Sequence, residues 1–190
     1  MVTIARYTIG AAALGLTLYA LTRPLSPGPL ELEPDARIGS LRPDDSALRR
    51  SLTPMQYRVT QRQYTEPAFD NAYHALFDDG IYVDVVSGEP LFSSEDKVQL
   101  GTGWPAFVRP LEPDNIYTRR TTMLNIERLE VRSVGADSHL GHVIADARVP
   151  TAMRFRVNSS ALRFIPADSL VAAGYAQYAA RFNTAASGTP

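Results

Sequence analysis

Few residue types in this chain can carry redox or metal chemistry. Its 190 residues contain no cysteine, three histidines and one tryptophan. Without a thiol, the chain cannot itself form a disulfide, a cysteine-ligated zinc site, an iron–sulfur cluster or a thiolate nucleophile. Two of the histidines, His139 and His142, are three residues apart, and the tryptophan, Trp104, lies between Gly103 and Pro105. Imidazole, indole, carboxylate and guanidinium groups are therefore the candidates for any chemistry.

The elements that must position these side chains are mostly β-strands. Runs of β-branched and aromatic residues are separated by Gly and Pro, as in short strands. The expected strands are 81–86, 106–109, 116–119, 126–133, 140–144, 154–158 and 162–165. Thr53 before Pro54 predicts the start of a short helix over 55–63, and further helices are expected at 72–77 and after Asp168. This pattern predicts a mainly β domain of antiparallel strands.

The N-terminal segment predicts a membrane anchor over residues 1–23. Residues 7–22 carry no charge, and Arg6 and Arg23 bound them. Sixteen helical residues span about 24 Å, slightly less than a hydrocarbon core of roughly 30 Å. We expect one transmembrane helix that enters the lipid bilayer through residues 2–22, and a cleaved signal peptide is the alternative. The positive amino end predicts a single-pass inner-membrane protein with a cytoplasmic N-terminus and a periplasmic domain.

The remaining organisation follows from composition. Residues 24–50 are rich in proline, which predicts an extended linker. The folded domain is expected over 51–182, followed by a small polar tail at 183–190. With 19 basic against 20 acidic residues, the net charge of −1 argues against a nucleic-acid partner. An apolar fraction of 45% excludes a disordered chain.

Ordered motifs run through the expected domain. They are Leu52-Thr53-Pro54, Thr65-Glu66-Pro67, Gly80 to Ser94, Gly101 to Phe107, Glu130 to Val143, Arg154 to Pro166 and Gly174-Tyr175. Together they resemble the B-type methionine sulfoxide reductases, which reduce the R epimer of methionine sulfoxide in proteins. The resemblance implies two antiparallel sheets in a tent-like arrangement with small flanking helices.

The resemblance also shows which reactive group is missing. In that family a cysteine thiolate in an R-Y-C-x-N-S pattern attacks the sulfoxide sulfur, and a second thiol resolves the product. Here Arg156 stands at the position of the nucleophile, and Thr102 stands at the usual resolving position. A guanidinium stays protonated and offers no lone pair, and a hydroxyl is a poor nucleophile toward sulfur. The resemblance therefore implies a pseudoenzyme, with both thiol positions lost.

Other pocket residues of the family are retained. By resemblance, Trp104 would pack on the substrate methyl group, and His142 would orient the sulfoxide and its water. The remaining members of this vestigial pocket are His139, Arg154 and Asn158. The alternative for each of these side chains is a purely structural role, in which it fills the core or bonds local backbone groups.

The zinc positions of the family are occupied by other residue types. Many relatives carry two C-x-x-C pairs, and the corresponding residues here are Asp84, Ser87, Ser133 and Ala136. Relatives with such substitutions fold without metal, so we expect neither a metal nor any other cofactor. Asp84 is expected to be a turn residue that accepts hydrogen bonds rather than a ligand.

The sequence thus favours a non-catalytic, membrane-anchored accessory or structural subunit of a larger membrane protein complex. Its partners would be membrane protein subunits and the lipid bilayer. The combination is similar to the reductase-like accessory subunit of bacterial photosynthetic reaction-centre and light-harvesting assemblies. Two alternatives stay open: a module that binds methionine or methionine sulfoxide without turnover, and an active peptide-methionine (R)-S-oxide reductase.

Overall fold

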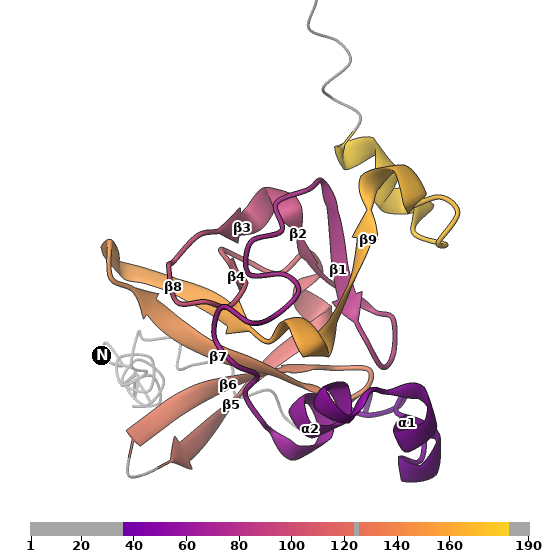
Figure 1. The fold of residues 1–190 in the computed structure, drawn as a ribbon, viewed down its shortest axis with the longest axis horizontal. Helices are drawn as coiled ribbons and strands as arrows, with labels where there is room; N and C mark the ends of the chain where they lie inside the picture. Colours follow the sequence, from indigo (N-terminus) through magenta and orange to yellow (C-terminus); the bar gives the residue numbers. More distant parts are fainter. Residues whose placement is uncertain (1–35, 124–125, 183–190) are drawn as a thin grey trace, which may run out of the picture. The chain divides into compact units, whose positions relative to one another are not determined.

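A computed structural model of the chain describes residues 36–123 and 126–182 (Figure 1). The expected membrane anchor and the tail at 183–190 lie outside the described residues. Within the described ranges, no helix combines the length and the apolar character that a membrane crossing requires. What the structure describes is two antiparallel sheets with small helices beside them, which confirms the expected fold class.

The smaller sheet has three strands and the larger has six. The smaller sheet has the order β2-β1-β9, formed by Pro90–Ser93, Gly80–Asp84 and Leu162–Pro166. The larger has the order β3-β4-β8-β7-β6-β5, formed by Lys97–Val98, Ala106–Phe107, Val149–Val157, His139–Asp146, Ile126–Ser133 and Ile116–Met123. All pairs of neighbouring strands are antiparallel. The long hairpins β5–β6 and β7–β8 extend to the same side of the domain (Figure 1).

Two short α-helices precede the sheets. Helix α2 (Pro54–Arg62) begins as expected, with Thr53 and Gln56 each bonding the backbone N–H of the other in a capping box. Helix α1 (Asp45–Ser51) falls inside the segment that we expected to be an extended linker. Leu48 on α1 is buried, and the preceding turn bonds the 133–138 loop because the N–H of Gly39 donates to the Val134 carbonyl at 2.8 Å. The segment from Gly39 to Ser51 therefore packs against the domain.

The core lies on both faces of β1, whose five residues are all buried. Side chains alternate between the two faces of a strand. Tyr82 packs into the main cluster, where the rings of Phe92 and Phe107 stack with centroids 4.4 Å apart. Ile81 and Val83 face a second cluster formed with the C-terminal segment. The apolar run at 81–83 is explained by this burial on both sides.

Several expected elements differ from the structure. Residues 72–75 form turns and residues 76–77 have no regular structure, so the expected helix is absent here. Lys97 donates hydrogen bonds to the carbonyls of Tyr73 and Leu76 in this segment. The expected C-terminal helix is replaced by two 3-10 helices, Ala167–Ser169 and Ala176–Arg181, separated at Gly174, whose φ is +87°. The other 3-10 helices are Ser94–Asp96, Pro113–Asn115 and Ser159–Ala161. Strands β2 and β3 were not expected from the sequence.

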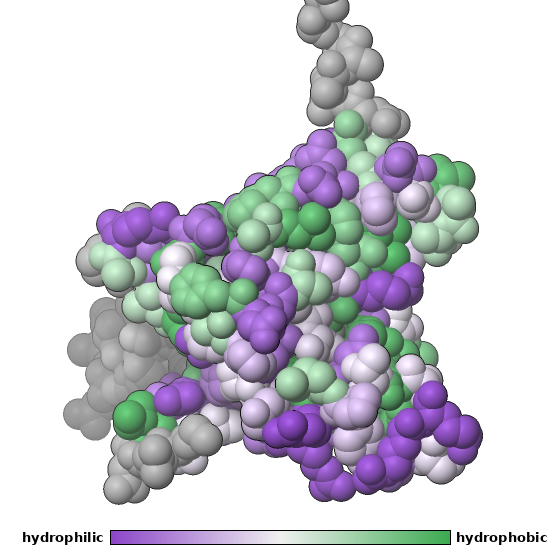
Figure 2. All heavy atoms as spheres, in the orientation of Figure 1, coloured by the Kyte–Doolittle hydropathy of each residue, from purple (hydrophilic) through white to green (hydrophobic). Residues whose placement is uncertain are grey.

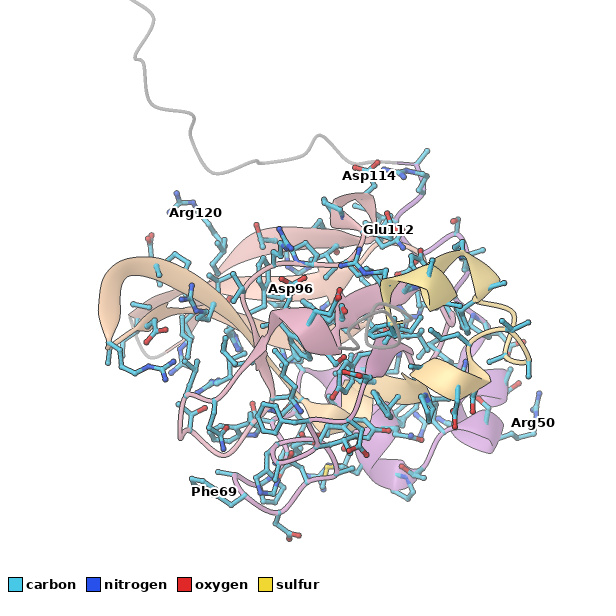
Figure 3. The ribbon with its side chains drawn as sticks, turned by 90° about the horizontal axis from the view of Figure 1, so that it is seen from above. Arg50, Phe69, Asp96, Glu112, Asp114 and Arg120 are labelled. Carbon is cyan, nitrogen blue, oxygen red and sulfur yellow. The ribbon has the colours of Figure 1, made fainter. Side chains whose placement is uncertain are left out.

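The surface differs in character from one end to the other. Hydrophilic residues cover α1, while apolar atoms are exposed over the C-terminal segment, where Val171 is 66% exposed (Figure 2). Viewed from above, Arg120 on β5 and Arg50 on α1 point outward on opposite sides (Figure 3). Arg50 is therefore a suitable control position for changes on the β5–β6 hairpin.

Candidate functional site

A row of cross-strand neighbours in the larger sheet brings the family's pocket positions together. Arg156 on β8 lies opposite Ala106 on β4 and opposite His142 on β7, and His142 in turn lies opposite Glu130 on β6. Directly opposed residues in an antiparallel sheet point to the same face. Gly141 permits the close approach of β7 to β8, because a Cβ there would lie 2.2 Å from the Arg156 carbonyl oxygen.

Trp104 lies at the end of this row, and the Arg156 side chain packs on its ring. The Arg156 guanidinium carbon is 4.6 Å from the centre of the indole ring, within the range of a cation–π contact. The indole N–H donates to the Glu66 carbonyl at 3.0 Å. The loop before Trp104 turns at Gly103, whose φ is +86° and whose Cβ position would lie 2.7 Å from the Phe69 nitrogen. The structure thus places Trp104 beside the lost nucleophile position.

Arg156 carries a positive charge that no carboxylate neutralises in the described part of the chain. Its side chain is half-buried, and its guanidinium group lies over the Trp104 ring. Burial, followed by the nearby charge of Arg128, lowers its pKa. An arginine nevertheless stays protonated near neutral pH. The site therefore holds a partly desolvated cation with free N–H donors.

His139 and Glu130 form the buried support of this face. The His139 Nδ1 lies 2.7 Å from a Glu130 oxygen, and both side chains are 1% exposed. Arg132 and Arg119 contact the same carboxylate at 2.7 and 2.8 Å. Burial alone would raise the pKa of Glu130, but the His139 hydrogen bond and the Arg132 charge outweigh it and lower the pKa to about 2. Because the ionised carboxylate only accepts, Nδ1 of His139 is the protonated nitrogen.

His142 is adjacent to this network and is uncharged at neutral pH. Its ring lies 5.4 Å from that of His139 in an edge-on arrangement. Burial, followed by the charges of His139, Arg128 and Arg156, lowers the pKa of His142 to about 4. A neutral imidazole has one donor and one acceptor nitrogen. His142 can therefore orient a polar ligand without being a strong base.

Asn158 and Glu66 hold the strands of the site from behind. The Asn158 amide donates to the Leu140 carbonyl at 2.9 Å and accepts from the Glu66 N–H at 3.1 Å. The buried Glu66 carboxylate accepts from Ser159 N–H, from Ser160 N–H at 2.8 Å and from the Ser160 hydroxyl at 2.5 Å. Glu66 lies in a family motif, but the sequence analysis assigned it no role. Its burial indicates its structural role, and burial is visible only in the fold.

Arg154 and Thr102 are further from the centre of the row. The Arg154 side chain lies 3.3 Å from Asp146, which also pairs with Arg148 at 3.1 Å. Arg154 is two residues from Arg156 on β8 and therefore points to the same face. The Thr102 hydroxyl is buried without a hydrogen-bond partner in the described chain.

The residues at the family's zinc positions do not fit a zinc ion. One Asp84 oxygen accepts from the N–H groups of Val86 and Ser87, at 2.6 and 3.2 Å, so Asp84 organises a turn. Burial raises the pKa of Asp84. Ser133 accepts from the Ser138 N–H at 3.0 Å, and Ala136 offers only a methyl group. Zinc prefers four nitrogen or sulfur ligands, and among the described residues no group of three acidic, His or Cys side chains could hold a metal.

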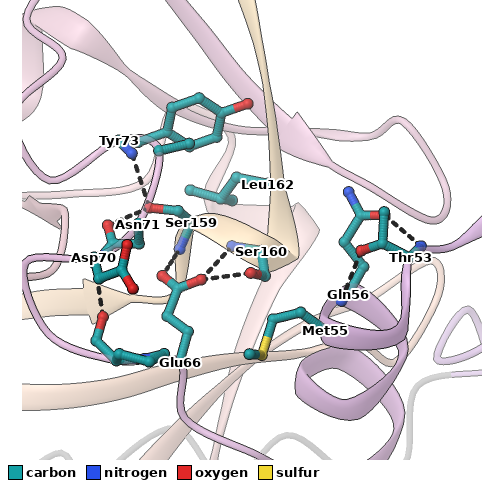
Figure 4. Close-up of a pocket in the computed structure, with 12 residues that line it drawn as sticks. Thr53, Met55, Gln56, Glu66, Asp70, Asn71, Tyr73, Ser159, Ser160 and Leu162 are labelled. Atoms are coloured by element: carbon teal, nitrogen blue, oxygen red, sulfur yellow. Dashed lines mark hydrogen bonds between the residues drawn. The ribbon is translucent and has the colours of Figure 1, made fainter.

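A separate hollow of about 200 Å³ lies behind the site, between α2 and the segments 66–73 and 159–162 (Figure 4). Its lining includes Met55, Glu66, Asn71 and Tyr73. The Glu66 backbone holds Trp104, whereas its side chain lines this hollow, so the segment at Glu66 separates the two. The polar groups drawn in Figure 4 bond one another, as when the Ser159 hydroxyl donates to Asn71 at 2.7 Å. These polar groups therefore hold the lining of the hollow in place.

Comparisons with known proteins identify the domain. A family model described as the SelR domain matches residues 52–166, which is more than half of the chain. The chain is 52% identical over 142 residues to a protein of Vibrio cholerae named peptide methionine sulfoxide reductase MsrA/MsrB. The match covers 75% of this chain and 38% of that relative, so the chain spans well under half of the relative's length.

These findings contradict the interpretation of the chain as a pseudoenzyme that serves as a structural subunit. Both the family model and the named relative point to a reductase. They also give no support to a photosynthetic or membrane assembly. The interpretation failed because the missing thiol restricts where the sulfur nucleophile comes from and does not by itself exclude reductase chemistry. The chain belongs to the SelR family and contains a methionine sulfoxide reductase domain of the B type.

Proposed function

We propose that this domain takes part in reducing the R epimer of methionine sulfoxide in peptides, with the thiol supplied by a second molecule. The SelR match and the relative named a peptide methionine sulfoxide reductase support the substrate class. Since the chain contains no cysteine, the sulfur nucleophile must come from outside it. The observation that carries the proposal is the Arg156 guanidinium on Trp104, directly opposite His142.

The chemistry balances with two equivalents of thiol. The first thiolate attacks the sulfoxide sulfur, so that a sulfur–sulfur bond forms and the sulfur–oxygen bond breaks. The oxygen takes up two protons and leaves as water. The second thiolate attacks the thiol-derived sulfur, which releases methionine as the thioether and leaves a disulfide. The sulfoxide gains two electrons, and the two thiols lose them.

Arg156 supplies the polarising group in this scheme. A sulfoxide oxygen is a hydrogen-bond acceptor, and a guanidinium carries several donors in a fixed plane. The Arg156 donors are not engaged by a carboxylate in the described chain, which leaves them for that oxygen. A positive charge at the oxygen withdraws electron density from sulfur, and it also attracts the incoming thiolate.

Trp104 and His142 would position the substrate. The indole ring offers an apolar surface for the methyl group of the sulfoxide. With a pKa of about 4, His142 is neutral at pH 7 and acts by hydrogen bonding to the oxygen or the departing water. The fixed His139–Glu130 pair keeps the neighbouring ring in place.

A thiol-driven assay on the full chain tests the proposal. Peptides carrying either the R or the S epimer of methionine sulfoxide are incubated with dithiothreitol or with a thioredoxin system, and the reduced peptide is quantified by mass spectrometry. We expect the R epimer to be reduced faster than in the buffer blank, and the rate to rise with thiol concentration. Trp104→Ala and Arg156→Met are expected to lower the excess rate at least tenfold, and the distant Arg50→Ala is expected to leave it unchanged.

A rate equal to the blank with both thiol sources, or equal rates for the two epimers, would overturn the proposal. Equal rates would mean that any reduction occurs without a chiral site. Loss of activity in Arg50→Ala as large as in Arg156→Met would point to damage of the fold instead of the site.

A further inference from the structure

The arginines on the site face of the larger sheet fall into paired and unpaired sets. Arg119 and Arg132 share Glu130, and Arg148 and Arg154 share Asp146. Within residues 36–123 and 126–182, neither Arg128 nor Arg156 forms a hydrogen bond or an ion pair with a carboxylate. The site therefore keeps two cations whose charge is not balanced locally.

These two cations approach His142 from opposite strands. Arg156 lies directly opposite His142 on β8. Arg128 lies on β6, two residues before Glu130, which is the other cross-strand neighbour of His142. The charge of Arg128 lowers the pKa of both Arg156 and His142, so the three groups are close enough to interact. Neighbouring strands lie about 4.8 Å apart and Arg128 is offset by two residues, about 7 Å, along β6, so the backbones of the two arginines lie about 12 Å apart.

Spacing and charge together restrict what could bind between these cations. Arg156 is half-buried and Arg128 is exposed, so an anion that arrives from solvent can reach both guanidinium groups and is attracted by both charges. A carboxylate suits a guanidinium because it accepts two parallel hydrogen bonds. The net charge of −1 argues against a long polyanion, whereas a peptide brings single carboxylates. In an extended peptide, side chains two residues apart point the same way and lie about 7 Å apart.

We infer that Arg128 recognises the carboxylate of an Asp or Glu within two residues of the oxidised methionine, while the methionine itself lies at Trp104 and Arg156. This inference rests on the proposed function for the placing of the methionine. It adds that the preferred substrates are acidic peptides and that Arg128 determines this specificity.

Binding can be measured without any turnover, because Trp104 is the single tryptophan of the chain. The full chain is titrated, in the absence of thiol, with three methionine-(R)-sulfoxide peptides that carry Asp, Ala or Lys two residues from the sulfoxide, and the Trp104 fluorescence is followed. We expect the Asp peptide to bind about fivefold more tightly than the Ala peptide, and the Lys peptide to bind more weakly than both. Raising the salt concentration should reduce these differences.

Variants identify the residue responsible. Arg128→Glu is expected to reverse the order of the Asp and Lys peptides, and Arg128→Lys is expected to keep the order. Arg50→Glu makes the same charge change on α1 and should leave the order unchanged. Equal dissociation constants for the Asp and Lys peptides, or an order that Arg128→Glu leaves intact, would overturn the inference.

The two proposals fail in different ways. Charge-dependent binding without thiol-driven reduction would overturn the proposed function and support the role of Arg128. Reduction of the R epimer with no preference among the three peptides would do the opposite. A chain whose Trp104 fluorescence responds to none of the peptides at millimolar concentration would overturn both.

Discussion

Two sets of arginines share one face of the larger sheet and differ in what they contact. Arg119 and Arg132 converge on the buried carboxylate of Glu130, where each charge has a fixed partner. Arg128 and Arg156 have no such partner in the described chain, and Arg156 rests on the Trp104 ring instead. The paired set consists of groups whose removal should damage the fold. The unpaired set consists of groups that the fold tolerates and that a ligand can use.

The strongest way to break this contrast is Glu130→Gln. The change leaves Arg132 and His139 buried beside a neutral amide, and breaking a buried ion pair on one side costs about 3–5 kcal/mol. We expect the free energy of unfolding, measured by urea titration, to fall by about that amount. Glu127→Gln, on the same strand but 76% exposed at the side chain, should change it by less than about 0.5 kcal/mol. Similar values for the two variants would contradict the structural role of Glu130.

The next effect concerns the support behind the site. Glu66→Gln replaces a carboxylate that accepts from the backbone of Ser159 and Ser160 and from the Ser160 hydroxyl. Loss of these charge-assisted bonds should lower the free energy of unfolding by about 1–3 kcal/mol. Ser160→Ala removes one donor and should have a smaller effect. If both variants unfold at the wild-type urea concentration, Glu66 does not hold this segment.

His142 sharpens the comparison through its pH dependence. Its pKa is about 4 in the folded chain, against an ordinary value of 6.5. Between these two values the unfolded chain binds a proton that the folded chain does not, so stability should fall as the pH drops through this window. His142→Gln should flatten the stability curve over this range, and His74→Gln should keep its slope. An unchanged slope in His142→Gln would show that other groups cause the acid sensitivity.

The smallest expected effect on stability belongs to the unpaired set. Arg156→Met removes a partly desolvated cation and keeps an apolar side chain on Trp104, so the free energy of unfolding should change by at most about 1 kcal/mol. The same variant should lose most of the thiol-driven activity. A large loss of stability would show that Arg156 has a structural role like Arg119 and Arg132, and would contradict the division into two sets.

Local sequence signals predicted a substantial part of the fold. Thr53 and Pro54 predicted the start of α2, and the run at 81–86 predicted β1 at Gly80–Asp84, because a helix cap and a run of β-branched and aromatic residues are local signals. The non-helical backbone at 72–77 could not be foreseen, since Lys97, more than twenty residues away, takes the carbonyls of Tyr73 and Leu76. Gly174 stops the C-terminal helix by its positive φ, which an apolar stripe alone does not reveal.

The resemblance predicted which residues come together in the site, but it did not predict how their charges interact. Trp104, His142 and Arg156 are together because the family motifs fix their strands. The contribution of Arg128 depends on a cross-strand distance, and that of Glu66 on burial, so neither could be recognised from the sequence alone. The inference against catalysis was wrong because it assumed that every reactive group of the reaction must come from this chain.

Lys97 has a consequence for chemical labelling. It is the single lysine of the chain, it is 8% exposed, and its amine donates to two carbonyls and to the Tyr82 hydroxyl. Burial lowers the pKa of this amine to about 8, so much of it is unprotonated in mildly basic buffer. Acylating reagents should therefore modify this side chain only when the segment 73–77 moves away from it. The rate of acylation at Lys97, measured as a single mass increment, then reports how often this part of the domain opens.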